Sequence, residues 1–209
     1  MKRFLSLLTV IAFIGISQIY GADTWEKVTD YSALSTSDTY VIAGNIKGGS
    51  TWYSLKNNQV TSNTNLPVGS TLTISNNKIT STISADETWV LESTSTSGVF
   101  YIKSTKGAYY LQNDGNTGSK ITSKSSTDGE NKWRIHYAQT SNNKTVTGLY
   151  NVGKSRELGC YNSSNWRCYT STNYGNLDGA EVCLYRKVTA SCTYKLSLSK
   201  VVSGNGSFF

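Results

Sequence analysis

Three passages of the sequence share one pattern, and this repetition constrains the fold more than any other feature. Each passage has a tryptophan strand, then a strand of aromatic or β-branched residues, a glycine turn, and a strand that carries an aromatic residue. The copies begin at Trp25, Trp89 and Trp133, which are 64 and 44 residues apart, and the first copy has an insertion around residues 60–83. A copy of this size cannot bury its apolar face alone, so the copies must pack on one another.

The strands themselves are short and rich in β-branched and aromatic residues, as in residues 40–42, 89–91 and 99–102. Turn-forming Asn, Asp, Ser and Gly residues separate them, and no window after the N-terminus sustains a helical apolar period over three turns. We therefore expect an all-β fold. Three pseudo-repeats in residues 24–188 predict a β-trefoil-like domain. A β-sandwich is the alternative, because Trp and Tyr are common in any strand.

The two ends of the chain differ from this central region. Residues 1–21 combine the positive charges of Lys2 and Arg3 with an apolar stretch and small residues at the end, which predicts a secretory signal peptide and export from a bacterial cell. Nothing downstream is long and apolar enough to cross a membrane. Residues 22–188 are expected to form one domain. Residues 189–209 are interpreted as a linker and the start of a truncated second β-domain, or else a natural end with a docked strand.

The cysteines all lie in the last quarter of the chain. In an exported protein they can form disulfides, and four cysteines allow three complete pairings. A hairpin turn expected at residues 162–165 favours one pairing across the turn, with the remaining two cysteines paired to each other, but the sequence leaves the choice open. No CxxC pair is present and the chain has one histidine, so no metal site is expected. The candidate disulfide residues are Cys160, Cys168, Cys183 and Cys192.

Several of these passages also resemble a known kind of module. The segments concerned are residues 25–29 with 40–42, residues 156–169, and residues 181–187. Together they resemble a non-catalytic, β-trefoil-like module of secreted Bacteroidetes multidomain proteins, often found beside extracellular nucleases or surface repeat domains. The resemblance spans residues 24–188 and implies an accessory, non-enzymatic role. Cys160, Cys168 and Cys183 stand where ordinary strand residues are expected, which leaves their role open.

Catalysis has little support in the sequence. The single histidine, His136, follows a strand and has no second histidine to accompany it, and no nucleotide-binding fingerprint is present. Asp86 and Glu87 are adjacent, so in an extended strand they would point to opposite faces, and we interpret them as a solvated turn. We therefore expect no enzymatic activity and no cofactor.

Binding fits the composition better, because 14 Tyr and 5 Trp accompany many Asn and Gly residues. Flat rings beside amide donors and acceptors suit carbohydrate recognition. The expected partner is a glycan or cell-surface polysaccharide, in a lectin-like or adhesion role. The alternatives are a polyanion such as nucleic acid, which the net charge of +7 would favour, and a protein partner or inhibitor target. The candidate ligand-binding residues surround the expected hairpin tip: Tyr161, Asn162, Trp166, Arg167, Tyr169 and Tyr174.

Overall fold

The structure is a computed structural model that describes residues 16–19, 23–189 and 193–196. The chain separates into two compact parts, residues 23–188 and the two terminal segments. In the terminal part, β1 (Ile16–Ile19) pairs antiparallel with β18 (Thr193–Leu196). The rest of the expected signal peptide, Cys192 and residues 197–209 of the expected second β-domain lie outside the described residues. Within the described residues no helix is long and apolar enough to cross a membrane.

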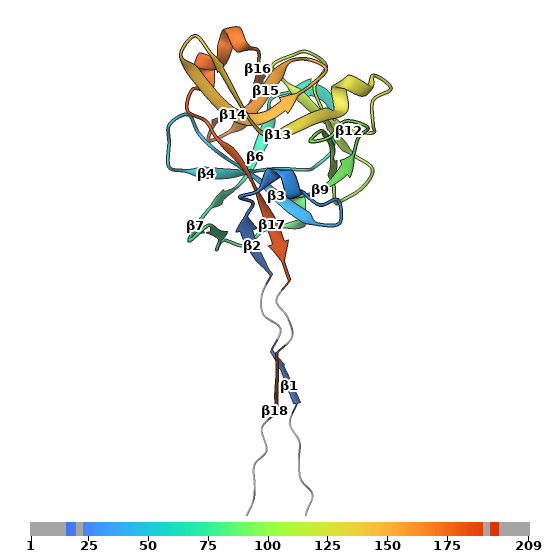
Figure 1. The fold of residues 1–209 in the computed structure, drawn as a ribbon, viewed down its shortest axis with the longest axis vertical. Coiled ribbons are helices and arrows are strands. Elements are labelled where there is room, and N and C mark those ends of the chain that lie inside the picture. Colours follow the sequence, from blue (N-terminus) through green and yellow to red (C-terminus); the bar gives the residue numbers. More distant parts are fainter. Residues whose placement is uncertain (1–15, 20–22, 190–192, 197–209) are drawn as a thin grey trace, which may run out of the picture. The chain divides into compact units, whose positions relative to one another are not determined.

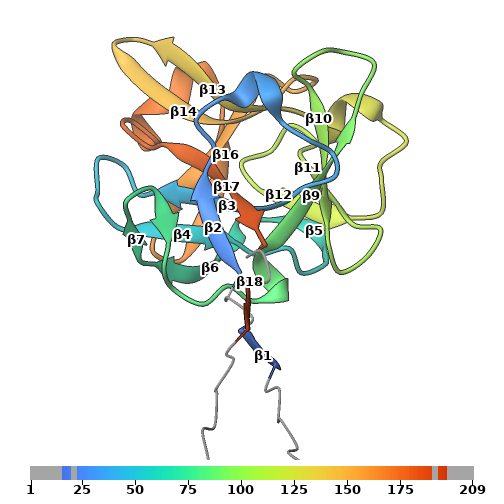
Figure 2. The ribbon, with the colours of Figure 1, turned by 60° about the horizontal axis from the view of Figure 1, so that its bottom comes forward.

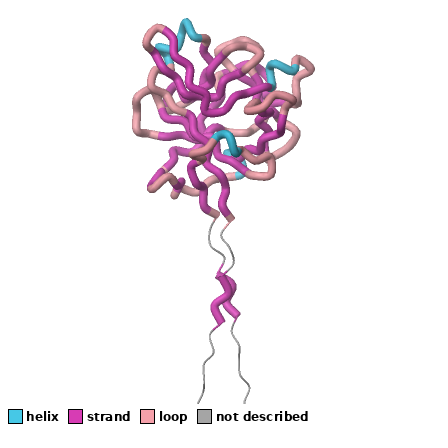
Figure 3. The backbone as a smooth tube through the Cα atoms, viewed as in Figure 1, coloured by secondary structure: helices cyan, strands magenta, loops and turns pink. Residues whose placement is uncertain are grey.

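Residues 23–188 form a domain built almost entirely of strands and turns (Figures 1 and 3). Its centre is a closed ring of six strands, and each of them except the fifth pairs antiparallel with the next. The ring closes between the fifth and sixth strands by a backbone bridge from Thr147 to Glu181. The ring strands, in order, are β3 (Thr39–Asn45), β9 (Thr88–Ser93), β10 (Phe100–Ser104), β13 (Lys132–Ser141), β14 (Lys144–Asn151) and β17 (Val182–Val188).

The first and second, the third and fourth, and the fifth and sixth ring strands are each connected by a segment of the same kind, which we call an excursion. The chain leaves the ring, forms a hairpin, and returns through a short 3-10 helix, so residues 39–93, 100–141 and 144–188 are three related repeats of a β-trefoil. The prediction of an all-β, trefoil-like fold is confirmed. The excursion elements are β4 (Trp52–Leu55), β5 (Val60–Thr64), β6 (Leu66–Leu72), β7 (Ile74–Ser75), β8 (Lys78–Ile79) and η2 (Ala85–Glu87); β11 (Tyr110–Gln112), β12 (Ser119–Thr122) and η3 (Asp128–Asn131); and β15 (Arg156–Asn162), β16 (Asn165–Tyr169) and η4 (Ser171–Asn176).

The repeats begin one strand later than the sequence pattern indicates. Trp89 lies opposite Tyr40 in the ring, and Trp133 lies opposite Phe100. The corresponding residue of the third repeat is Val182, and not Trp25. Trp25 belongs to β2 (Thr24–Lys27), which pairs with the other edge of β17 and precedes the first repeat. A circular arrangement has no intrinsic starting point, so the period of the sequence could not fix where a repeat begins.

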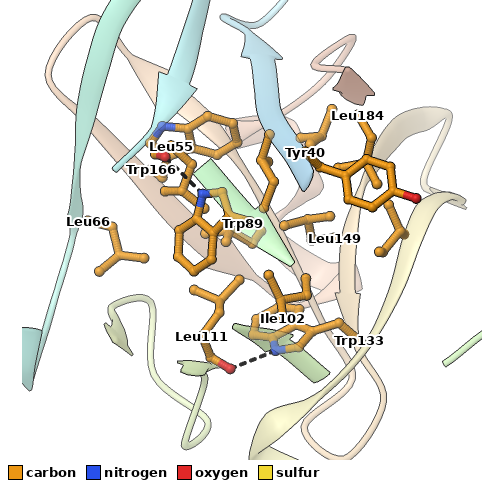
Figure 4. Close-up of a cluster of buried hydrophobic side chains, with 14 of the residues drawn as sticks. Tyr40, Leu55, Leu66, Trp89, Ile102, Leu111, Trp133, Leu149, Trp166 and Leu184 are labelled. Carbon is orange, nitrogen blue, oxygen red and sulfur yellow. Dashed lines mark hydrogen bonds between the residues drawn. The ribbon is translucent and has the colours of Figure 1, made fainter. Parts of the chain in front are cut away.

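The core inside the ring is organised by three fully buried tryptophans, Trp89, Trp133 and Trp166 (Figure 4). Trp89 Nε1 donates to the Leu55 carbonyl at 3.1 Å, and Trp133 Nε1 donates to the Leu111 carbonyl at 2.9 Å. These two bonds are equivalent by the repeat symmetry. In the third repeat Val182 is too small to fill the same space, and Trp166 from β16 occupies the core instead, with its Nε1 3.3 Å from the Ser54 carbonyl.

The ring of Trp166 packs directly on the backbone of Gly44. A Cβ atom added at Gly44 would lie 2.5 Å from the end of the Trp166 ring, which is far inside van der Waals contact. We therefore expect Gly44→Ala to lower the free energy of unfolding by about 1–3 kcal/mol, as overpacking does in a rigid core. Denaturant unfolding measures this loss. Gly175→Ala is the matched control, because no atom lies within 4 Å of its added Cβ; an equal loss in both variants would contradict the packing argument.

The insertion expected at residues 60–83 forms β5 to β8. β5 pairs with β12, and β6 pairs with β4 and β16, whereas β8 pairs with β2, which lies beside β17 on the outside of the ring (Figure 2). A second apolar cluster fills this layer and consists of Trp25, Val41, Ala43, Leu72, Ile79, Cys183 and Tyr185. The first repeat is therefore longer than the others because its excursion also shields the exterior of two ring strands.

Candidate functional site

Three of the six candidate ligand-binding residues are buried, so the expectation that they reach solvent is wrong. Trp166 has 0 % exposure, Tyr174 has 2 % and Tyr169 has 7 %. Trp166 points into the core because strand residues alternate between faces, and its neighbours in β16 point outward. Tyr169 and Tyr174 pack in a third apolar cluster with Leu177. These rings are structural.

The other three candidates, Tyr161, Asn162 and Arg167, are half-buried at the β15–β16 hairpin. The guanidinium carbon of Arg167 lies 4.0 Å from the centroid of the Tyr161 ring. Asn162 Oδ1 accepts the backbone N–H groups of Ser164 and Asn165 and so shapes the turn. One face of the half-buried Tyr161 ring is therefore already covered by the protein's own arginine.

The described cysteines Cys160, Cys168 and Cys183 are buried free thiols, so the disulfide expected between Cys160 and Cys168 is not formed. The hairpin register explains why. Cys160 lies opposite Trp166, whereas Cys168 lies opposite Leu158. Cys168 Sγ instead lies 3.2 Å from Ser119 Oγ.

A different surface feature gathers polar side chains around an open cleft. The cleft has a volume of about 400 Å³ and lies between the segment that follows β4 and the β10–β11 turn. We call it the amide cleft. It is lined by Asn57, Asn58, Gln59, Lys106 and Tyr109.

Asn57 is the structural centre of the amide cleft. Its side chain is fully buried, and Nδ2 donates to the carbonyls of Ala85 at 2.9 Å and Thr88 at 2.5 Å. These bonds join the end of β4 to η2 and β9. The acceptor atom Oδ1 is buried and has no hydrogen-bond partner among the described residues. An unpaired buried acceptor costs about 1–3 kcal/mol.

The rim of the amide cleft is held by an ion pair. Lys106 Nζ lies 2.7 Å from Asp86 Oδ1 and 3.0 Å from Asn58 Oδ1. The hydrogen bond from Lys106 lowers the pKa of Asp86, so this carboxylate stays ionised at neutral pH. Tyr109 is half-buried, and its ring packs over Gly107, where an added Cβ would lie 3.1 Å from the ring.

Glu87, next to Asp86, is buried rather than solvated, contrary to the sequence interpretation. Burial alone would raise its pKa, but hydrogen bonds from Ser54, Ser70 and Ser84 lower the pKa to about 2. The carboxylate therefore fixes η2 against β4 and β6. This anchoring holds Asp86 and the rim of the amide cleft in place.

The repeat symmetry places a lysine at the same hairpin turn in each repeat. Lys106 contacts Asp86 of η2, Lys154 contacts Glu130 of η3 at 3.5 Å, and Lys47 donates to the Gly175 carbonyl of η4 at 2.8 Å. The second repeat carries Asp114 at the position that corresponds to Asn58 in the first repeat. The carboxylate of Asp114 is already bound by Asn63, Asn116 and Lys120.

Comparison with known proteins gives a likeness of fold alone. No protein-family model matches the chain, and no curated protein matches it. Among solved structures, a designed three-fold symmetric protein, ThreeFoil, is 13% identical with a TM-score of 0.43 and covers 73% of this chain and 99% of its own. The BEL β-trefoil is 14% identical with a TM-score of 0.47 and covers 74% and 96%.

A Polyporus squamosus lectin, solved with a human-type influenza-binding epitope, is also similar. It is 10% identical with a TM-score of 0.47. The match covers 72% of this chain and half of the lectin chain.

Proposed function

We propose that the domain of residues 23–188 is a non-catalytic carbohydrate-binding module and that the amide cleft holds one sugar unit of its ligand. The observation that carries the proposal is a cleft of about 400 Å³ lined by three side-chain amide residues and one tyrosine ring. Asn58 and Gln59 offer both donors and acceptors for neighbouring hydroxyls, and the Tyr109 ring offers an apolar face.

The charge distribution favours a neutral or weakly charged glycan over a polyanion. In the described domain, nine lysines and one arginine each form an ion pair with a carboxylate. The cleft lysine, Lys106, is itself neutralised by Asp86. Binding of a polyanion depends on releasing counterions and weakens steeply with salt. Because the lysine that lines the cleft is already paired, the proposed site should bind with little salt dependence.

The biological setting belongs to the same proposal. The signal-peptide pattern of residues 1–21 and the resemblance to accessory modules of secreted Bacteroidetes proteins support an exported protein that attaches to a cell-surface polysaccharide. Two other functions compete with this one: holding a polyanion beside a nuclease, and binding a protein partner. The same binding assay distinguishes both from glycan binding.

A glycan-array screen of the purified chain, followed by calorimetry at low and high salt, tests this function. We expect saturable binding that changes less than threefold between the two salt concentrations. Tyr109→Ala should weaken binding at least tenfold, about 1.4 kcal/mol, because it removes the apolar face of the cleft.

Tyr161→Ala is the matched control, because it removes a half-buried tyrosine away from the amide cleft and should leave affinity unchanged. Steep salt dependence with heparin or DNA would replace this function by the polyanion role. Loss of glycan binding in Tyr161→Ala alone would move the site to the β15–β16 hairpin.

A further inference from the structure

A second cluster of reactive side chains lies away from the amide cleft, and it begins with a bulge in β13. Ile135 pairs with Leu149 and Tyr137 pairs with Gly148, which leaves His136 as an extra residue with a positive φ of 53°. Such a backbone is uncommon for a residue other than glycine, and bulges re-aim the side chain that they carry. The His136 ring turns toward β17, where Nδ1 lies 2.9 Å from the Val182 carbonyl oxygen.

The orientation of the His136 ring fixes which nitrogen is free. A carbonyl oxygen only accepts, so this hydrogen bond has Nδ1–H as its donor, and in the neutral ring Nε2 is then the nitrogen available to a metal ion. The ring is also stacked on Tyr31, with centroids 4.3 Å apart and planes 7° apart. Histidines that bind metals are oriented in this way, by a bond from the other ring nitrogen to a backbone carbonyl.

Two further potential ligands come from β17 and the residue before it. Glu181 and Cys183 are two positions apart, so their side chains lie on the same face. Cys183 Sγ lies 3.1 Å from Glu181 Oε1. One ligand atom from each of His136, Glu181 and Cys183 lies within 4.8 Å of the other two.

A lysine at present supplies the positive charge beside these groups. Lys27 Nζ lies 3.5 Å from Glu181 Oε1, and 5.9 Å from the centroid of the Trp52 ring on another side. Its side chain is 26% exposed. The ammonium group can therefore withdraw toward Trp52 and solvent when a stronger cation enters.

We propose that His136, Glu181 and Cys183 form a binding site for a zinc-type divalent metal ion. Imidazole, thiolate and carboxylate are the ligands that Zn²⁺ takes in four-coordinate sites, and three protein ligands leave one position for water. Zinc bonds of about 2.0–2.3 Å place ligand atoms roughly 3.5 Å apart. Side-chain rotations that move the ligand atoms by about 1 Å would therefore bring all three within bonding distance of one ion. Binding forms the metal–sulfur bond, releases the thiol proton to solvent and displaces Lys27 from Glu181.

Titration of the reduced, metal-free full chain with Co²⁺ tests the site spectroscopically. We expect one equivalent to bind with tetrahedral Co²⁺ absorption and a thiolate-to-cobalt charge-transfer band, and Zn²⁺ to bleach both. Cys183→Ser should abolish the charge-transfer band. Cys168→Ser, which alters another buried free thiol, is the matched control and should retain it.

A gain-of-binding variant keeps the test independent of folding losses. Lys27→Met removes the competing cation and should tighten Co²⁺ binding at least fivefold, with unchanged near-ultraviolet circular dichroism. Absence of a charge-transfer band in the unmodified chain, its persistence in Cys183→Ser, or weaker binding in Lys27→Met would each overturn the proposal.

Discussion

Replacing Trp166 with alanine is expected to lower the free energy of unfolding by about 3–5 kcal/mol, the range found when a buried tryptophan is removed. The ring is fully buried, fills the space that Val182 leaves in the third repeat, and donates to the Ser54 carbonyl. Denaturant unfolding followed by circular dichroism measures the loss. A loss of glycan binding in this variant would report unfolding and not a removed contact.

The same residue allows a sharper test by a double-mutant cycle. Gly44→Ala is costly because its Cβ would strike the Trp166 ring. In a Trp166→Leu background that clash is removed, so Gly44→Ala should cost at least 1 kcal/mol less than it does in the unmodified chain. Strictly additive losses would show that Gly44 is required for another reason, and the account of the third repeat would be wrong.

The second large effect concerns Glu157, a fully buried residue of β15 that lies opposite Tyr150 and Tyr169. Neither carboxylate oxygen has a hydrogen-bond partner among the described residues. Burial raises the pKa of Glu157 to about 9, and the nearby Gly148 N–H offsets this only in part. The folded protein therefore holds a proton on Glu157 at neutral pH, whereas the unfolded chain does not.

Stability should consequently fall as pH rises. Above the ordinary glutamate pKa of about 4.3, only the folded state keeps the proton, so unfolding releases it and becomes easier by up to about 1.4 kcal/mol per pH unit until pH reaches about 9. Glu157→Gln cannot lose a proton. It should match the unmodified chain near pH 4 and exceed its stability by about 5 kcal/mol at pH 8.

Chemical denaturation at a series of pH values between 4 and 9 checks this slope. Glu87→Gln is the matched control, because the lowered pKa of Glu87 contributes stability above about pH 4.5 that is lost as pH falls toward 2. That variant should change the acid limb and leave the slope above pH 5 unaltered. A flat profile between pH 5 and 8 in the unmodified chain would contradict the burial of a neutral Glu157.

The sequence was sufficient for the fold because the repeated tryptophans are core residues. Trp89 and Trp133 have equivalent partners, and turn residues between strands exclude long helices. The starting point of the repeat was misplaced at Trp25, because Val182 at the third position carries no aromatic signal. Only the three-dimensional structure shows that Trp166, from a different strand, takes the place in the core that Val182 leaves.

The candidate site was harder to predict for a related reason. Aromatic residues at the β15–β16 hairpin suggested a surface, but strand alternation turned Trp166 inward. Tyr169 and Tyr174 pack in the third apolar cluster, and Tyr161 lies under Arg167. The amide cleft had one readable signal: leucine followed two residues later by asparagine recurs at Leu55–Asn57 and at Leu111–Asn113. No spacing rule could bring His136 to Cys183, because they lie on strands that are far apart in the chain.

The most direct test of the amide cleft is a nuclear magnetic resonance titration of the labelled chain with the best glycan from the array. The account predicts that the side-chain amide signals of Asn57, Asn58 and Gln59 shift together with the backbone signals of Lys106 and Tyr109, while signals of Arg167 and Tyr161 stay in place. Shifts confined to the β15–β16 hairpin, or to no part of this cleft, would contradict it.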